Sequence, residues 1–114
     1  MRRTLLAIAL GVWPLTAVAQ KARPVVSIAD AIKTLDSGDT VTVAGRATAG
    51  TGQLQSTVFD IALEDASGGV RVFSRTLEAS VRVGDSIVAT GVVKTYRGTI
   101  EIVGTSLKIG RAHV

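Results

Sequence analysis

Alternation of apolar and polar residues is strongest in the stretch VFDIALEDASGGVRVFSR, residues 58–75. Two runs in it, 58–64 and 70–74, place an apolar side chain at every second position, so each run has one apolar face when its backbone is extended. The connection between them, 65–69, contains adjacent glycines, which adopt the backbone conformations of a tight turn at little cost. The pattern therefore predicts a β-hairpin with one buried face.

A helical spacing precedes this hairpin. Ser27 is a preferred N-cap residue, and Asp30 follows three positions later as in a weak capping box. The apolar residues that follow at i, i+3, i+4 and i+7 are Ile28, Ala31, Ile32 and Leu35. Gly38 ends the pattern. We expect a helix of about two to three turns that packs its single apolar face against the sheet.

Three further runs predict strands: 40–48, 87–95 and 99–103, the last prolonged by Leu107 and Ile109. Tyr96, Arg97 and Gly98 are expected to form the turn of the final hairpin. The polar stretch 49–56 predicts a loop. The stretch 75–83 is compatible with one helical turn or with a bent loop.

Two segments of the chain echo each other: GDTVTVAG at 38–45 and GDSIVATG at 84–91. Both begin with a Gly-Asp turn and end with a glycine inside the predicted strand, at Gly45 and Gly91. Glycine within a strand is typical of a bulge or a sharp bend, and such bends let strands turn the corner of a small barrel. One helix and five short strands, bent by glycine within the first and the fourth, therefore predict a small closed or nearly closed barrel.

The first 19 residues have the anatomy of a secretory signal peptide: a basic start, an apolar run and the small-x-small sequence Ala17-Val18-Ala19. A membrane-spanning helix would need about 20 apolar residues, and Pro14 interrupts the run. We expect cleavage after Ala19 and a periplasmic or secreted protein. The predicted organisation is a signal peptide at 1–19, an extended linker at 20–26, one domain at 27–110 and a disordered tail at 111–114.

Removal of the signal peptide changes the charge. The 114-residue sequence has 13 basic and 9 acidic residues, and loss of Arg2 and Arg3 leaves 11 basic ones, a net charge of +2. This balance permits an anionic partner without demanding one. The chain has no cysteine, which excludes disulfides and thiol chemistry. An Ala-, Val- and Gly-rich chain without asparagine suggests a bacterial exported protein.

Three phrases together resemble the OB-fold domain of the nucleic-acid-binding type, as found in exported bacterial proteins. They are Val41-x-Val43-x-Gly45, Ile61-x-Leu63-x-Asp65-x-x-Gly68-Gly69-Val70-x-Val72, and Gly84-Asp85-x-Ile87-x-Ala89-x-Gly91. The resemblance covers residues 38–109 and implies an all-β fold, a five-stranded Greek-key barrel, here with a short N-terminal helix. The helix and the Asp65–Gly68 turn are also similar to small periplasmic OB-fold proteins linked to stress.

The sequence offers little for catalysis. Its single histidine, His113, lies in the predicted tail, so a histidine-based triad or metal site is not expected. Asp60, Glu64 and Asp65 form a dense acidic cluster that lacks the further ligands of a calcium loop, and we interpret it as two solvent-facing strand residues and a turn residue. The glycine pairs match no phosphate-binding loop. The prediction is a binding module with no catalytic residue, metal or cofactor.

The candidate ligand-binding residues follow from the parity of the strands. OB-fold domains bind ligands on the face of their second and third strands, between two flanking loops. Outward basic and aromatic residues in those places are Arg46, Arg71, Phe73, Lys94, Tyr96 and Arg97. Basic groups along a phosphate track and rings that stack on bases are typical of binding to single-stranded DNA or RNA.

Other interpretations remain open at this point. Phe73 would be ordinary core if it lay beneath the N-terminal helix. Tyr96 is also compatible with a role as a loop anchor. The chain as a whole is also compatible with a periplasmic stress-type protein that binds a protein or envelope component, or with an accessory domain of a separate enzyme.

Overall fold

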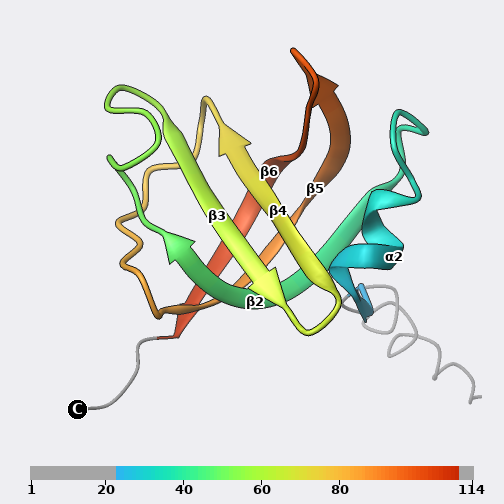
Figure 1. The fold of residues 1–114 in the computed structure, drawn as a ribbon, viewed down its shortest axis with the longest axis horizontal. Helices are drawn as coiled ribbons and strands as arrows, with labels where there is room; N and C mark the ends of the chain where they lie inside the picture. The colour runs from blue at the N-terminus through green and yellow to red at the C-terminus, as the bar shows by residue number, and fades with distance from the viewer. Residues whose placement is uncertain (1–22, 111–114) are drawn as a thin grey trace, which may run out of the picture.

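Five strands close into a barrel in the computed structural model, which describes residues 23–110 (Figure 1). The elements in chain order are β1 (Val25–Val26), α2 (Ile28–Ile32), β2 (Thr40–Ala49), β3 (Phe59–Asp65), β4 (Gly68–Ser74), β5 (Ser86–Tyr96) and β6 (Thr99–Gly110). Neighbouring strands follow the order β1-β2-β3-β4-β6-β5, and β5 pairs again with β2. This is the Greek-key order of the OB-fold, so the predicted all-β class and the closed barrel are confirmed.

Closure depends on β2, which curves beneath the β3–β4 hairpin and reaches β5 behind it (Figure 1). Its residues from Thr40 to Arg46 pair with β5, and from Arg46 onward it pairs with β3. Gly45 lies directly before this change of partner, where an added Cβ would lie 2.7 Å from the carbonyl oxygen of Glu64. The close approach of two backbones therefore requires glycine there, while the bulge of β2 falls later, between Ala47 and Ala49.

The two echoing segments are neighbours in the barrel. Val41 pairs with Gly91 and Gly45 pairs with Ile87, so 38–45 and 84–91 run antiparallel to each other. The pairing of β5 with β6 shifts between Thr90 and Gly91, as expected for a bulge at this glycine. An added Cβ at Gly91 would collide with the carbonyl oxygen of Val103.

The barrel interior is aliphatic. Buried residues from all five barrel strands form one cluster, among them Val43, Ile61, Val72, Ile87 and Ile102, each at most 1% exposed. Ile28 and Ala31 of α2 belong to the same cluster. Each fully buried aliphatic side chain of this size stabilises the fold by about 1.5–3 kcal/mol, so the cluster is the main stabilising feature of the domain.

The helix is shorter than predicted, but its start is as expected. Ser27 is the N-cap, and its side chain accepts a hydrogen bond from the backbone N–H of Asp30. The free N–H groups of the first turn are held by the β3–β4 turn: Ile28 donates to Asp65 Oδ2 and Ala29 to Ser67 Oγ, both at 2.9 Å. The turn residue Asp65 thus fixes the helix against the barrel.

Both hairpin connections are tighter than the sequence pattern predicts. Asp65 still pairs with Gly68, which leaves two residues in the first connection, and Tyr96 pairs with Thr99, which leaves Arg97 and Gly98 in the second. Arg97 and Gly98 both have positive φ angles, 50° and 82°, as a two-residue type I′ turn requires.

The remaining segments resolve the ambiguity at 75–83 and show that part of the predicted linker belongs to the sheet. The stretch after β4 contains bends and turns but no helix before β5 begins, which decides the ambiguity at 75–83. Part of the predicted linker is paired, because β1 lies parallel to β2. The predicted signal peptide, the start of the linker and the tail at 111–114 lie outside the described residues. No helix within residues 23–110 is long and apolar enough to cross a membrane.

Candidate nucleic-acid interface

A cavity of about 410 Å³ opens on the outer face of the barrel, where the ends of β4 and β6 meet the β5–β6 turn. This volume lies within the range of about 300–1,000 Å³ that is usual for ligand sites. Its walls come from residues far apart in the sequence: Gln55, Val58, Arg71, Phe73, Arg75, Tyr96, Arg97, Thr99 and Glu101. Four of the six predicted binding residues, Arg71, Phe73, Tyr96 and Arg97, therefore lie around one cavity.

Two arginine–aromatic pairs stand at the cavity. The guanidinium carbon of Arg75 lies 5.3 Å from the ring centre of Phe73, and that of Arg97 lies 5.3 Å from the ring centre of Tyr96. These separations are within the range of cation–π attraction, about 0.5–1 kcal/mol at exposed sites. Tyr96 is 57% exposed, so a ring face remains accessible to a ligand. Each pair presents a flat surface and a positive charge together.

Alternation along β4 places Arg71, Phe73 and Arg75 on the same side. Val70 and Val72 lie inside the barrel, and Arg71 and Phe73 are half-buried outside it. Phe73 is not a member of the buried core cluster, which decides against its interpretation as core beneath the helix. Arg75 continues the alternation by one step past the end of the strand. The sequence analysis did not name it as a binding residue, because the predicted strand stops at Ser74.

Asp60 corrects one interpretation of the acidic cluster. It is fully buried rather than solvent-facing. Arg71 donates to it through Nε, at 3.2 Å from Oδ1, and through one terminal nitrogen to Oδ2, while Gln55 Nε2 donates to Oδ2 at 2.8 Å. The hydrogen bond to Asp60 raises the pKa of Arg71 above its usual value. The free-energy cost of removing water from the Asp60 carboxylate is offset, because these donors supply the hydrogen bonds that water would make.

One acidic side chain lines the cavity itself. Glu101 on β6 is 8% exposed, and its carboxylate makes no hydrogen bond or ion pair with another of residues 23–110. Burial raises the pKa of Glu101, nearby Asp60 raises it further, and Arg71 lowers it. Glu101 was missed by sequence analysis, although a charged residue within the β-branched run of β6 is a signal for it. The cavity thus combines three arginines with one buried carboxyl group.

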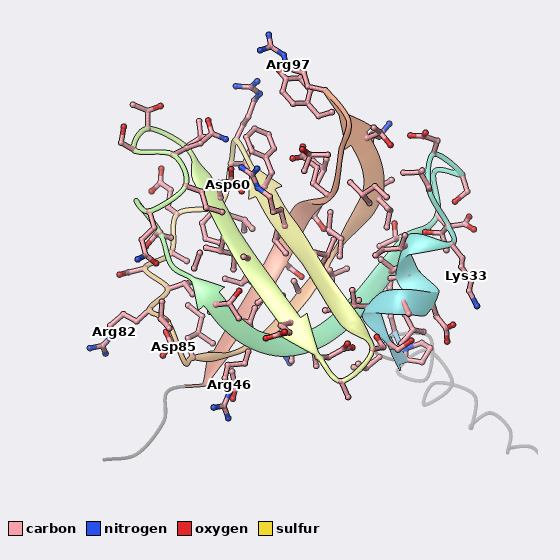
Figure 2. All side chains as sticks on the ribbon, viewed as in Figure 1. Lys33, Arg46, Asp60, Arg82, Asp85 and Arg97 are labelled. Carbon is pink, nitrogen blue, oxygen red and sulfur yellow. The ribbon has the colours of Figure 1, made fainter. Side chains whose placement is uncertain are left out.

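Two predicted site residues lie elsewhere. Arg46 projects from the opposite end of the barrel to Arg97 (Figure 2) and lines a separate shallow cavity together with Ser86 and Lys108. Lys94 is exposed on β5, opposite Glu101 in the strand register, but it does not line the cavity. The structure therefore does not bring these two cations together with the aromatic pairs.

No group of three or more histidine, cysteine, aspartate or glutamate side chains within the described part of the chain is arranged to hold a metal ion. The carboxylate of Asp65, a member of the acidic cluster, already accepts hydrogen bonds from the helix and from its own turn. Hydrogen bonds from Ser67, Ile28 and Gly68 lower the pKa of Asp65 to about 2.

Comparison with known proteins gives the fold and little more. No family model matches the chain, and no curated protein matches its sequence significantly. Among solved structures, the chain is similar to a chain of the Stn1–Ten1 complex of S. pombe, with a TM-score of 0.54 and 17% sequence identity. The match covers 64% of this chain and 59% of that one, so this chain spans less than two thirds of the length of its structural neighbour. A likeness at this identity supports the OB-fold assignment that the strand order gives.

Proposed function

We propose that this chain is a non-catalytic OB-fold module that binds single-stranded nucleic acid at the cavity between β4, β6 and the β5–β6 turn. The observation that carries the proposal is the pair of arginine–aromatic contacts, Arg75 with Phe73 and Arg97 with Tyr96, at one cavity. Bases stack on aromatic rings without regard to sequence, and arginines beside them contact the backbone phosphates.

The position of the cavity supports the same function. OB-folds take oligonucleotides on the face of their second and third barrel strands, between the two flanking loops. These strands are β3 and β4 here, and β4 contributes Arg71 and Phe73 to the cavity. The loop before β3 contributes Gln55, and the β5–β6 turn contributes Arg97. Arg71 serves chiefly to hold Asp60, which leaves Arg75 and Arg97 as the cations for phosphate.

The experiment is a titration of the purified protein with a labelled, short oligothymidylate at about 50 mM and about 200 mM salt. We expect binding that weakens as salt rises, with a slope of about −0.7 per phosphate contacted. Duplex DNA of the same length should bind more weakly, because its bases cannot reach Phe73 and Tyr96. No binding at the lower salt, or binding indifferent to salt, would overturn the proposal.

Failure of that titration would favour the alternative, an envelope protein that binds a protein or another envelope component. Cross-linking in a periplasmic extract distinguishes the two. An envelope partner should be recovered whether or not nuclease is added, whereas partners bridged by nucleic acid should be lost after nuclease treatment.

Export belongs to the same proposal and rests on the signal-peptide pattern of residues 1–19. Protein recovered from the periplasm or medium should begin at Gln20 when its N-terminus is sequenced. Recovery of chains that still begin at Met1, in the cell interior alone, would contradict export.

A further inference from the structure

Glu101 is not explained by binding to phosphate. It is buried at the cavity, 8% exposed, and its carboxylate has no hydrogen-bond partner among residues 23–110. A buried polar group without a partner costs free energy, and more when it is charged. Negative charge at the cavity would also repel a phosphate. An unsatisfied buried group calls for an explanation, and at a cavity a ligand that supplies the missing donors is one.

We propose that Glu101 determines base specificity by accepting hydrogen bonds from the Watson–Crick edge of a guanine held at the cavity. This inference rests on the proposed function of the cavity and adds the identity of the base. Proteins that bind single strands read this edge with side chains while the base stacks on an aromatic ring. The exposed ring of Tyr96 provides that stacking surface at the same cavity.

The choice of guanine follows from counting donors. A carboxylate only accepts hydrogen bonds, and its two oxygens suit two adjacent N–H donors. Guanine presents two, the ring N1–H and the exocyclic N2 amino group. Adenine and cytosine each present one amino group beside an acceptor, and thymine presents one N–H between two carbonyl oxygens that would face the carboxylate.

Arg71, the neighbour of Glu101, supplies a donor for the third polar group of the guanine edge, the O6 oxygen. Arg71 is the register partner of Glu101 on the adjacent parallel strand β4. Its Nε and one terminal nitrogen bind Asp60, and the other terminal nitrogen makes no hydrogen bond with a described residue. That nitrogen is a donor suited to the O6 acceptor of guanine. Asp60 thereby also fixes the orientation of the guanidinium group.

The test uses oligothymidylates in which the central base is replaced by guanine, hypoxanthine, adenine or cytosine. The guanine strand should bind the purified protein about tenfold more tightly than the all-thymine strand, within the range usual for a bidentate contact. Hypoxanthine lacks the N2 amino group and should lose a large part of this gain. Free dGMP is titrated in parallel, because a free guanine nucleotide has the same edge.

Glu101→Gln is the informative variant, since it keeps the size of the side chain and replaces one acceptor oxygen by a donor. It should lose the preference for guanine and bind the all-thymine strand more tightly, because a negative charge beside the phosphates is gone. Glu64→Gln removes an equal charge at a different, exposed position and should keep the guanine preference. Thermal unfolding of both variants checks that the fold is retained.

The outcomes separate the two proposals. Binding of all strands with equal affinity would overturn the role of Glu101 and leave nucleic-acid binding in place. Guanine preference that survives in Glu101→Gln would also overturn it. Tight binding of dGMP with no binding of any strand would support the reading of guanine and overturn single-strand binding, whereas no binding of any ligand would overturn both.

Discussion

Arg71 on β4 reaches diagonally across the β3–β4 ladder to Asp60, although its own register partner on β3 is Ala62. Asp60 is fully buried, and about a third of the Arg71 side chain remains exposed. Arg71 lines the candidate binding cavity and Asp60 does not, so the ion pair joins a side chain of the cavity to a fully buried one. Arg71 thus stabilises the fold by binding Asp60, and Asp60 fixes the orientation of the Arg71 guanidinium group at the cavity.

The first prediction concerns this ion pair. Arg71→Ala leaves the buried carboxylate of Asp60 without its main partner, and we expect a loss of about 3 kcal/mol in the free energy of unfolding. This is the lower end of the range for broken buried pairs, since Arg71 is partly in water. Urea unfolding measures it. The double variant Asp60→Ala/Arg71→Ala should recover part of the loss, and a single variant as stable as the parent would contradict the structural role.

The second prediction concerns pH. The folded state lowers the pKa of Asp65 from 3.8 to about 2, so the ionised carboxylate stabilises the fold. This contribution is fully present above pH 3.8 and is lost as the pH falls through about 2. The Asp65→Asn side chain has one acceptor oxygen instead of two, so it cannot accept all of the hydrogen bonds that the carboxylate accepts from α2 and the turn. It should be less stable than the parent at pH 6, and the difference should shrink as the pH is lowered toward 2.

Thermal unfolding of the parent and Asp65→Asn across that pH range checks the prediction. Asp39→Asn removes a carboxylate at an exposed position before β2 and is the control for the loss of one negative charge. A stability difference between parent and Asp65→Asn that stays constant down to pH 2 would show that the carboxylate charge at Asp65 is not responsible.

The third prediction concerns barrel closure. Gly91→Ala places a methyl group against the carbonyl of Val103, so the β5–β6 pairing must shift. We expect a loss of about 2 kcal/mol, since overpacking costs roughly 1–3 kcal/mol. Gly110→Ala is the matched control, because its added Cβ would lie 3.7 Å from the Cβ of Ser86, an ordinary contact. Equal stability of the two variants in urea would contradict the prediction.

The fourth prediction concerns stacking. Tyr96→Ala removes an exposed ring and should leave the fold intact, because Tyr96 is 57% exposed. It should weaken binding of a short oligothymidylate by about 1–3 kcal/mol, the usual contribution of one stacked base. Fluorescence anisotropy measures the affinity. An unchanged affinity in a folded variant would exclude Tyr96 from the interface.

The fifth prediction separates two arginines that the sequence analysis treats alike. Arg97 lies at the cavity and Arg46 at the opposite end of the barrel (Figure 2). Arg97→Ala should lower the salt dependence of single-strand binding by about 0.7 in slope, which is one phosphate contact. Arg46→Ala should have a smaller effect, similar to that of Arg82→Ala, an exposed control outside the cavity. A larger effect of Arg46→Ala would move the interface to the other end.

The sequence by itself determined the barrel and most of its strands. Alternation in 58–64 and 70–74 predicted the central hairpin and its buried face, and Ser27 marked the start of the helix, because these features depend on local geometry. Gly91 also indicated its bulge, because a close approach of two backbones that leaves no room for a Cβ restricts the position to glycine.

Only the tertiary structure decided which outward residues share a site. Alternation predicts that a residue lies on the outside of the barrel. It does not predict where on the outer surface the residue lies, because that surface runs all the way round the barrel. Arg46 and Arg97 are both outside and lie at opposite ends, whereas Phe73 and Tyr96 line the same cavity because β4 and β5 both pair with β6. The burial of Asp60 and Glu101 was likewise decided by neighbours from other strands, which no period within one strand can reveal.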